Sequence, residues 1–167
     1  MTSIYWIDGS WSGRLALVSR PRGGDWLETD VRAWASAGIN VVVSLLTRPE
    51  VGQFELLQEA TLCCDQDIQF LQFPIVDRRV PMSYDTSLTF VKKLEETLSH
   101  GRNIGIHCRQ SIGRSAIIAS AILVLAGVEP ERSLKIVAKA RGMTVPETQE
   151  QRDWVMSFGK EIMAPAN

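Results

Sequence analysis

Short apolar runs alternate with amphipathic segments along this chain, and this order constrains the fold more than any other feature. Runs rich in β-branched residues predict buried strands, and apolar residues at every third or fourth position predict helices. Strands separated by helices of about 10 to 15 residues are typical of βαβ units and of a largely parallel sheet. The expected strands are Ile4–Ile7, Leu15–Ser19, Ile39–Leu46, Phe70–Val76 and Asn103–His107.

Helices are expected where a capping residue, a proline or a glycine marks the end of an apolar stripe. The expected helices are Asp25–Ala37, Pro49–Cys63, Ser83–Ser99, Gly113–Ala126, Pro130–Arg141 and a last one that opens at Pro146. The segment 115–126 is apolar nearly all round, which predicts that it is buried in the middle of the domain. The predicted fold class is therefore α/β, with a central, mostly parallel sheet of about four to five strands and helices on both faces.

The length and the charges exclude several classes of protein. The 167 residues are expected to form a single domain over 1–167, because about 150 residues is a common domain size. The 18 Lys and Arg against 19 Asp and Glu give a net charge of −1, so we expect no nucleic-acid partner. The longest uncharged runs have 15 and 14 residues, fewer than the ~18 that cross a bilayer, so we expect no membrane partner. The first residues have no secretory pattern, and three cysteines fit a reduced compartment, which predicts a cytoplasmic location.

The most informative stretch is a loop between a strand and a helix, H-C-R-Q-S-I-G-R-S at 107–115. Such a loop exposes backbone N–H groups beside the positive end of a helix, and both favour an anion. The loop carries a nucleophile, Cys108, and an arginine, Arg114, whose planar fork can grip two phosphate oxygens. The helix end and the guanidinium favour the thiolate form of the cysteine. Together these groups indicate attack on phosphorus through a phosphocysteine intermediate.

Phosphoryl transfer of this kind also needs a proton donor for the leaving oxygen. Asp77 ends the predicted strand F-L-Q-F-P-I-V-D and lies 31 residues before Cys108. It is therefore the candidate general acid, and Asp85 is the second choice because it falls inside the next predicted helix. The alternative for Asp77 is a solvated ion pair with Arg78 or Arg79.

The loop His107–Ser115 resembles the H-C-x5-R-S/T signature of the cysteine-dependent protein tyrosine phosphatase superfamily, and most of the chain resembles its compact dual-specificity-like members. The resemblance implies a general acid at the position of Asp77. It also implies that the Ser115 hydroxyl hydrogen-bonds the cysteine sulfur and helps it leave in the hydrolysis step. The stretch E-T-Q-E-Q at 147–151 resembles the E-T-x-x-Q region of the kinase-associated branch. By that resemblance Gln151 lies near the pocket and orients water; the alternative is a surface glutamine on a helix.

The predicted phosphate cradle departs from the more common loop, which has Ala-Gly where this sequence has Gln110-Ser111. If position 111 needs a positive φ, serine is less favourable there than glycine. His107 is expected to tune the thiolate through the loop backbone, with a satisfied core histidine as the alternative. The residues expected to bind the substrate phosphate are Arg109, Gln110, Ser111, Ile112, Gly113 and Arg114.

These features predict a monomeric phosphatase that hydrolyses phosphotyrosine, and also phosphoserine or phosphothreonine, in a phosphorylated protein or peptide. The wider substrate range rests on family analogy, and no metal or organic cofactor is required. Three alternatives stay open: a phosphoinositide or other small-molecule phosphatase, a rhodanese-type sulfurtransferase, and a phosphate-binding module without catalysis. The loop 109–111 lacks the lysines that a lipid phosphatase would favour. Cys63 and Cys64 are interpreted as core packing rather than as redox partners of Cys108.

Overall fold

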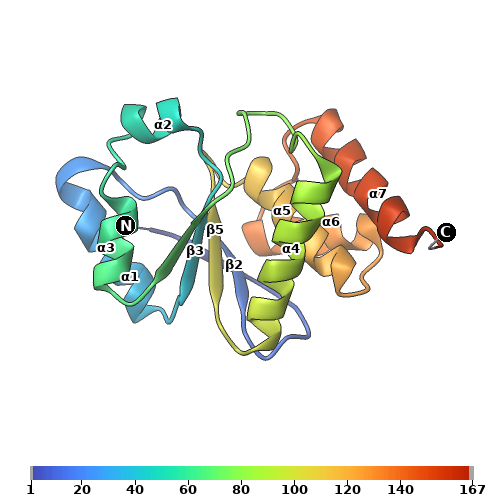
Figure 1. Cartoon of the computed structure of the whole chain (residues 1–167), viewed down its shortest axis with the longest axis horizontal. Helices are drawn as coiled ribbons and strands as arrows, with labels where there is room; N and C mark the ends of the chain where they lie inside the picture. The colour runs from blue at the N-terminus through green and yellow to red at the C-terminus, as the bar shows by residue number, and fades with distance from the viewer. Residues whose placement is uncertain (1, 166–167) are drawn as a thin grey trace.

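A five-stranded sheet runs through the centre of the computed structural model, which describes residues 2–165 (Figure 1). Its strand order is β1-β2-β5-β3-β4, so the last strand of the sequence lies in the middle of the sheet. β5 pairs in parallel with β2 and β3, β3 pairs in parallel with β4, and β1 runs antiparallel to β2. The strands are β1 (Ile4–Ile7), β2 (Leu15–Val18), β3 (Val41–Ser44), β4 (Gln69–Gln72) and β5 (Ile104–His107). The predicted sheet, mostly parallel, is confirmed.

Helices cover both faces of the sheet, as Figure 1 shows. One face carries the 3-10 turn η1 (Gly24–Trp26), α1 (Leu27–Ser36) and α3 (Glu59–Asp65). The other carries α4 (Tyr84–Ser99), α5 (Arg114–Leu125), α6 (Pro130–Arg141) and α7 (Gln149–Met163), while α2 (Arg48–Gln53) lies beyond the carboxyl end of β3. This arrangement confirms the predicted α/β class. Within residues 2–165, no helix is long and apolar enough to cross a membrane.

Two hydrophobic cores result from the alternation of side chains along the buried strands. In β2, Leu15 and Leu17 pack in the core that includes α5, whereas Ala16 and Val18 pack in the core that includes α1. Every residue of α5 from Arg114 to Val124 is buried, as its uniformly apolar sequence predicts. The segment that follows β5 therefore begins between two packed layers.

The predicted helix Pro49–Cys63 is wrong as a single element, because the structure has two short helices there, α2 and α3. Glu55, between them, has a φ of 56°, a left-handed backbone that an α-helix of L-residues does not continue. The break separates α2, which lies beyond the carboxyl end of β3, from α3, which packs against α1.

The strand predicted over Phe70–Val76 is too long, because β4 ends at Gln72. Beyond Gln72 the backbone still donates two hydrogen bonds to the segment of β3, from Phe73 N–H to the carbonyl oxygen of Ser44 and from Ile75 N–H to that of Leu45, each over 3.0 Å. Pro74, between them, has no N–H to donate. Asp77 therefore lies in the loop between β4 and α4 rather than at the end of a strand.

The last helix begins at Gln149, three residues after the predicted opener Pro146, and Thr148 is its N-cap. α7 packs against α5 and α6. The approach to α6 is close at Gly159, where a Cβ atom would lie 2.2 Å from the Cγ atom of Pro130. Glycine is therefore required at this position by packing rather than by backbone angle.

Gly159→Ala is expected to destabilise the fold, although alanine favours a helix over glycine by about 1 kcal/mol. The new Cβ would overlap Pro130, and overpacking of this kind costs about 1 to 3 kcal/mol. Gly52→Ala in α2 is the matched control, because a Cβ there meets no atom within 4 Å. Urea unfolding should give a lower free energy of unfolding for Gly159→Ala alone, and an equal gain in both variants would contradict the close contact.

Candidate active site

Cys108 follows the central strand β5 directly, at the carboxyl edge of the sheet, where α/β proteins commonly bind ligands. The loop from Cys108 to Gly113 joins β5 to α5, so Arg114 is the first residue of the helix. This loop borders a cavity of about 210 Å³. Of the predicted phosphate-binding residues, all but Ser111 line it. The lining residues are Asp77, Arg78, Cys108, Arg109, Gln110, Ile112, Gly113, Arg114 and Glu147.

The side chain of Arg114 is buried, with 1% of its surface exposed, and Glu50 holds it. Arg114 Nη1 donates to Glu50 Oε2 and Nη2 donates to Glu50 Oε1, each over 2.8 Å. Nη1 also donates to the carbonyl oxygen of Ile75 over 2.8 Å. Glu50 in turn accepts the backbone N–H of Thr47 over 2.9 Å, at the start of α2. These bonds fix the guanidinium in one orientation beside the cavity.

The pair of Arg114 and Glu50 is charged at neutral pH. Burial alone would lower the pKa of Arg114, yet its hydrogen bond to Glu50 and the charge of Cys108 raise that pKa above its usual value. Burial alone would raise the pKa of Glu50, but hydrogen bonds from Arg114 and Thr47 lower it to about 2. The arginine therefore supplies a permanent positive charge at the loop.

Asp77 reaches the same guanidinium from the loop after β4. Its Oδ1 atom lies 3.1 Å from Arg114 Nη2, and its side chain is 38% exposed. Its Oδ2 atom lies 3.6 Å from Arg109 Nη1. Among the described residues, Asp77 makes no ion pair with Arg78 or Arg79, so the solvated pair considered from the sequence is not formed. The carboxyl group faces the cavity and stays open to solvent.

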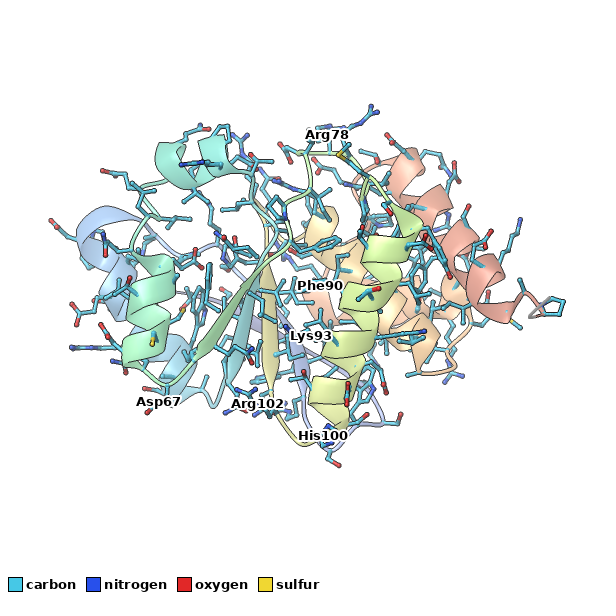
Figure 2. The ribbon with its side chains drawn as sticks, viewed as in Figure 1. Asp67, Arg78, Phe90, Lys93, His100 and Arg102 are labelled. Atoms are coloured by element: carbon cyan, nitrogen blue, oxygen red, sulfur yellow. The ribbon has the colours of Figure 1, made fainter. Side chains whose placement is uncertain are left out.

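Arg78 and Glu147 form a rim of the cavity. Arg78 Nη1 lies 2.8 Å from Glu147 Oε1. Figure 2 shows Arg78 on the loop before α4, at the edge of the molecule that also holds α2. Arg79 instead pairs with Glu150 over 3.6 Å and does not line the cavity. The place of Glu147 at this rim was not predicted from the sequence.

His107 is fully buried and joins two elements behind the loop. Its Nε2 atom lies 2.6 Å from Oε1 of Glu59, a buried residue of α3. Its Nδ1 atom lies 3.4 Å from the carbonyl oxygen of Cys108, and its ring stacks on Trp34 with centroids 5.9 Å apart. The ring thus connects a buried carboxylate to the backbone of the cysteine, a position that fits an influence through the loop backbone.

Ser111 has a φ of 58°, the left-handed backbone that glycine adopts more readily. Its hydroxyl donates a hydrogen bond of 2.6 Å to the carbonyl oxygen of Val18. Arg141, at the end of α6, donates to the carbonyl oxygens of Ser111 and Gln110 over 3.2 and 3.3 Å. Serine is therefore accommodated by a bond that glycine could not make, and the arginine supports the loop from outside.

Gln151 is fully buried, so the alternative of a surface glutamine is wrong. Its Oε1 atom accepts the backbone N–H groups of Glu147 and Thr148, each over 3.1 Å. Its Nε2 atom donates to the carbonyl oxygen of Arg79 over 3.2 Å. A Cβ atom added to Gly113 would lie 3.0 Å from both the Oε1 and the Nε2 atom of Gln151. Gln151 therefore packs directly against the loop and ties it to the start of α7.

The hydroxyl of Ser115 is buried in the first turn of α5 and has no hydrogen-bond partner among the described residues. Its bond to the sulfur of Cys108 stays a prediction for the hydrolysis step. A buried hydroxyl without a partner is unfavourable, which is consistent with a group that acts only when charge develops nearby.

Cys63 packs in the core of α1, whereas Cys108 packs in the core of α5, on the other face of the sheet. Burial, together with the charge of Glu59, raises the pKa of Cys63 to about 12. Both facts agree with the interpretation of Cys63 as core packing, whereas the same interpretation of Cys64 is wrong, because its side chain is exposed. Within residues 2–165, no group of three or more His, Cys, Asp or Glu side chains is arranged to hold a metal ion.

Sequence reasoning missed Glu50, Glu59 and Arg141, which support the loop from other elements. T-R-P-E at 47–50 is a capping-box pattern and marks the start of a helix. Nothing in that pattern points to Arg114, which lies 64 residues away. The signal in the sequence is general. A buried arginine or histidine requires a buried partner, so each acidic residue was a candidate for that role.

Solved phosphatase structures share this fold. The kinase associated phosphatase, with its catalytic-site cysteine substituted by serine, superposes with a TM-score of 0.88 at 21% identity, over 98% of this chain and 97% of that one. Tk-PTP in its active form gives 0.77 at 26% identity, over 95% and 97%. PTPMT1 in complex with PI(5)P gives 0.70 at 18% identity, over 87% and 91%. The fold is therefore that of the protein tyrosine phosphatases.

The family model described as "PTP-SAK: Swiss Army Knife protein, DSP-PTPase phosphatase domain" matches residues 3–156. The chain belongs to this dual-specificity-type phosphatase family, which confirms the resemblance drawn from the cysteine loop. Cyclin-dependent kinase inhibitor 3 of Sus scrofa is 24% identical over 140 residues, which are 83% of this chain and 66% of that protein. The putative tyrosine phosphatase 197R of Invertebrate iridescent virus 6 is 31% identical over 87 residues, 50% of this chain and 31% of that protein. The chain thus spans less than two thirds of these curated relatives.

Glu50→Gln is expected to lower the free energy of unfolding by about 3 kcal/mol at neutral pH, because it removes the partner of a buried charge. The pKa of Glu50 in the folded protein, about 2, lies below its ordinary value of 4.5. Its contribution is therefore complete above about pH 5 and is lost as the pH falls toward 2. The free energies of unfolding of wild type and Glu50→Gln, measured by denaturant titration, should therefore become equal as the pH falls through this window.

The matched control is Glu28→Gln, which removes an exposed pair with Arg32 on α1. Its effect should stay below about 0.5 kcal/mol. The opposite outcome is that wild type and Glu50→Gln differ in free energy of unfolding by the same amount down to about pH 2. That result would contradict the charged pair of Glu50 and Arg114.

Ser111→Ala and Ser111→Gly should differ, although both remove the hydrogen bond to Val18. The alanine variant keeps the left-handed backbone and should lose about 1 kcal/mol of stability. The glycine variant recovers about 1 kcal/mol, because glycine adopts this backbone without strain. Thermal unfolding should place Ser111→Gly near wild type and Ser111→Ala below it, and the reverse order would count against this explanation.

Proposed function

We propose that this chain hydrolyses phosphomonoesters on tyrosine, and on serine or threonine, in phosphorylated proteins, through a phosphocysteine intermediate on Cys108. The observation that carries the proposal is that Cys108, Arg114 and Asp77 line one cavity. These side chains offer the nucleophile, the phosphate-binding cation and the acid that the reaction needs. The family match over residues 3–156 supports the same activity, and supports one phosphatase domain over residues 1–167.

In the first step the thiolate of Cys108 attacks phosphorus. The bond between phosphorus and the leaving oxygen breaks, and that oxygen takes a proton from Asp77, so that a neutral phenol or alcohol departs. The backbone N–H groups of the loop 109–113 and the guanidinium of Arg114 hold the three other oxygens. The positive charge of Arg114 is already fixed by Glu50, so it needs no reorganisation during the reaction.

In the second step water attacks the phosphocysteine. Asp77, now a carboxylate, takes the proton of the water, the bond between sulfur and phosphorus breaks, and inorganic phosphate leaves. The hydroxyl of Ser115 donates to the departing sulfur of Cys108, and the amide of Gln151, packed beside Gly113, orients the water. The thiolate is thereby restored.

The contact of Asp77 with Arg114 couples the binding of the substrate phosphate to the position of the general acid. Each Nη atom of an arginine carries two hydrogens. Those of Nη1 bond Glu50 and Ile75, and one of those on Nη2 bonds Glu50, while Asp77 lies 3.1 Å from Nη2 as an ion pair. A substrate phosphate takes the other Nη2 hydrogen and displaces Asp77 from this ion pair. The carboxyl group of Asp77 is then released toward the leaving oxygen.

A phosphoinositide is the second candidate substrate, because PTPMT1, which shares the fold, was solved in complex with PI(5)P. At 18% identity this likeness bears on the fold alone. The loop 109–111 has one arginine and no lysine, and a headgroup with several phosphates favours several cations. These points lead us to favour the protein substrate.

Turnover of p-nitrophenyl phosphate without added metal tests the mechanism. Cys108→Ser is expected to lose nearly all activity, because a hydroxyl is a far weaker nucleophile than a thiolate. Asp77→Asn should lower kcat about 10² to 10⁴-fold, with a smaller deficit for esters whose leaving groups need less protonation.

Asp85→Asn is the matched control, since Asp85 lies on α4 and does not line the cavity. Undiminished activity in Cys108→Ser would overturn the mechanism. Equal losses in Asp77→Asn and Asp85→Asn would remove Asp77 from its role. Phosphopeptides and PI(5)P vesicles, compared by kcat/KM, then decide between the two substrate classes.

A further inference from the structure

The ring of His107, behind the cysteine loop, has an acceptor oxygen beside each of its nitrogens. Oε1 of Glu59 lies 2.6 Å from Nε2, and the carbonyl oxygen of Cys108 lies 3.4 Å from Nδ1. A neutral imidazole has one N–H, whereas an imidazolium has two and donates from both nitrogens. A neutral ring beside an ionised Glu59 would leave a bare nitrogen facing one of the two oxygens. Two arrangements avoid this: an imidazolium beside a carboxylate, or a neutral ring that accepts a proton from the carboxylic acid of Glu59.

Glu59 has no other cation to pair with. Its side chain is 2% exposed and that of His107 is 0% exposed, and a buried carboxylate is stable only beside a donor or an opposite charge. Among the described residues, no lysine or arginine lies within ion-pair distance of Glu59. Arg48 lines the same cavity of about 440 Å³, but its side chain is exposed. The ring of His107 is therefore the group that can neutralise Glu59.

The indole of Trp34 favours the charged form of the ring. It stacks on His107 with centroids 5.9 Å apart and an angle of 24° between the planes. The face of an indole attracts a cation at this distance. Both rings are fully buried, and the attraction is stronger where water is excluded. The stacking thus favours the imidazolium over the neutral ring.

The other ionisable group near the pair is Cys63, on the same helix as Glu59. Burial and the charge of Glu59 raise the pKa of Cys63 to about 12, so this thiol stays neutral and adds no charge. Cys108 faces the pair from the other side, through its own carbonyl group. The charges at this place are therefore those of Glu59, His107 and, when it is ionised, Cys108.

We propose that Glu59 is a positioning residue, which keeps His107 as an imidazolium whose charge behind the loop stabilises the thiolate of Cys108. The proposal rests on the phosphatase function proposed above, because it concerns how that nucleophile forms. Glu59 does not line the catalytic cavity, and it therefore acts through the ring of His107 rather than on the substrate.

The orientation of the pair explains how its charge reaches the loop. Glu59 contacts the far nitrogen of the ring and Cys108 the near one, so the positive end of the pair faces the loop. The carbonyl group of Cys108 belongs to the peptide bond whose N–H is that of Arg109. A hydrogen bond to this carbonyl polarises the peptide bond and makes its N–H a stronger donor. The thiol of Cys108 loses its proton to water, and the pair takes up none.

The first test measures how the alkylation of Cys108 by iodoacetamide depends on pH, because the thiolate is the form that reacts. Cys64→Ser removes the exposed thiol from every protein compared. Glu59→Gln keeps the shape of the side chain and an oxygen that can accept from Nε2, but it removes the charge that holds the second proton on the ring. The midpoint pH of alkylation should rise by about one unit in Glu59→Gln.

Asp30→Asn is the matched control, because Asp30 is also a buried carboxylate, 1% exposed, on the neighbouring helix α1. Its partner is Arg22, at 2.7 Å, which does not contact the cysteine loop. The midpoint pH should stay at the wild-type value in this variant. An unchanged midpoint in Glu59→Gln, or an equal rise in both variants, would overturn the role of Glu59.

The second test reads the ring in the protein with Glu59 in place, so it does not depend on the folding of Glu59→Gln. The chain has two histidines, and Figure 2 shows the other, His100, at the end of α4, far from Arg78 at the rim of the catalytic cavity. His100→Gln therefore assigns the ring nitrogen signals in an NMR spectrum. His107 should give the signals of an imidazolium at about pH 7.5, where an unperturbed histidine is mostly neutral. Signals of a neutral ring would overturn the proposal.

Neither test requires turnover, so the proposed function and the role of Glu59 can fail separately. If the midpoint shifts but p-nitrophenyl phosphate is not hydrolysed, the phosphatase function is refuted and the role of Glu59 is supported. If the protein is an active phosphatase, kcat/KM below both midpoints should fall about tenfold in Glu59→Gln, in line with the loss of thiolate. An active phosphatase with an unshifted midpoint would keep its function and refute the role of Glu59.

Discussion

The buried charge of Arg114 organises the site, because a guanidinium with 1% exposure needs partners inside the protein. Glu50 provides a two-point carboxylate, Ile75 a carbonyl oxygen, and Asp77 a second carboxylate. These partners come from α2 and from the loop after β4, so the arginine ties both segments to the first turn of α5. The charge that we propose to bind the phosphate is thus the same charge that holds the cavity walls in place.

The loop around Cys108 is supported from both faces of the sheet. His107 and Glu59 support it from the side of α3, while Arg141 and Gln151 support it from the side of α6 and α7. Binding sites work when their groups are held to within about 0.5 Å, and buried contacts on all sides provide such rigidity. A neighbouring cavity of about 350 Å³ shares this support, because Arg141 both donates to the loop carbonyls and forms part of the cavity wall.

Local sequence was sufficient for the features that depend on short-range order. The alternation of strands and helices predicted the sheet and its covered faces, and nine consecutive residues predicted the loop of Cys108 and Arg114. The helix break at Glu55 was missed because glutamate is no marker of left-handed backbone. The grip of Glu50 on Arg114 joins residues 64 apart, and Arg20 meets its aromatic ring only through the packing of separate elements. Periodicity and spacing do not encode such pairs.

The central position of β5 in the sheet has a consequence for folding during synthesis on the ribosome. β2 and β3 do not pair with each other, because β5 lies between them, and β5 is the last strand to be synthesised. The growing chain therefore carries an open sheet until residue 107 is made, and Cys108 is the next residue added. Contacts of long sequence separation form only after this closure, and those of Gln151 come later still. All five strands are thus made before Cys108 is added, but the loop that carries it gains all of its contacts only after α5, α6 and α7 have also been made.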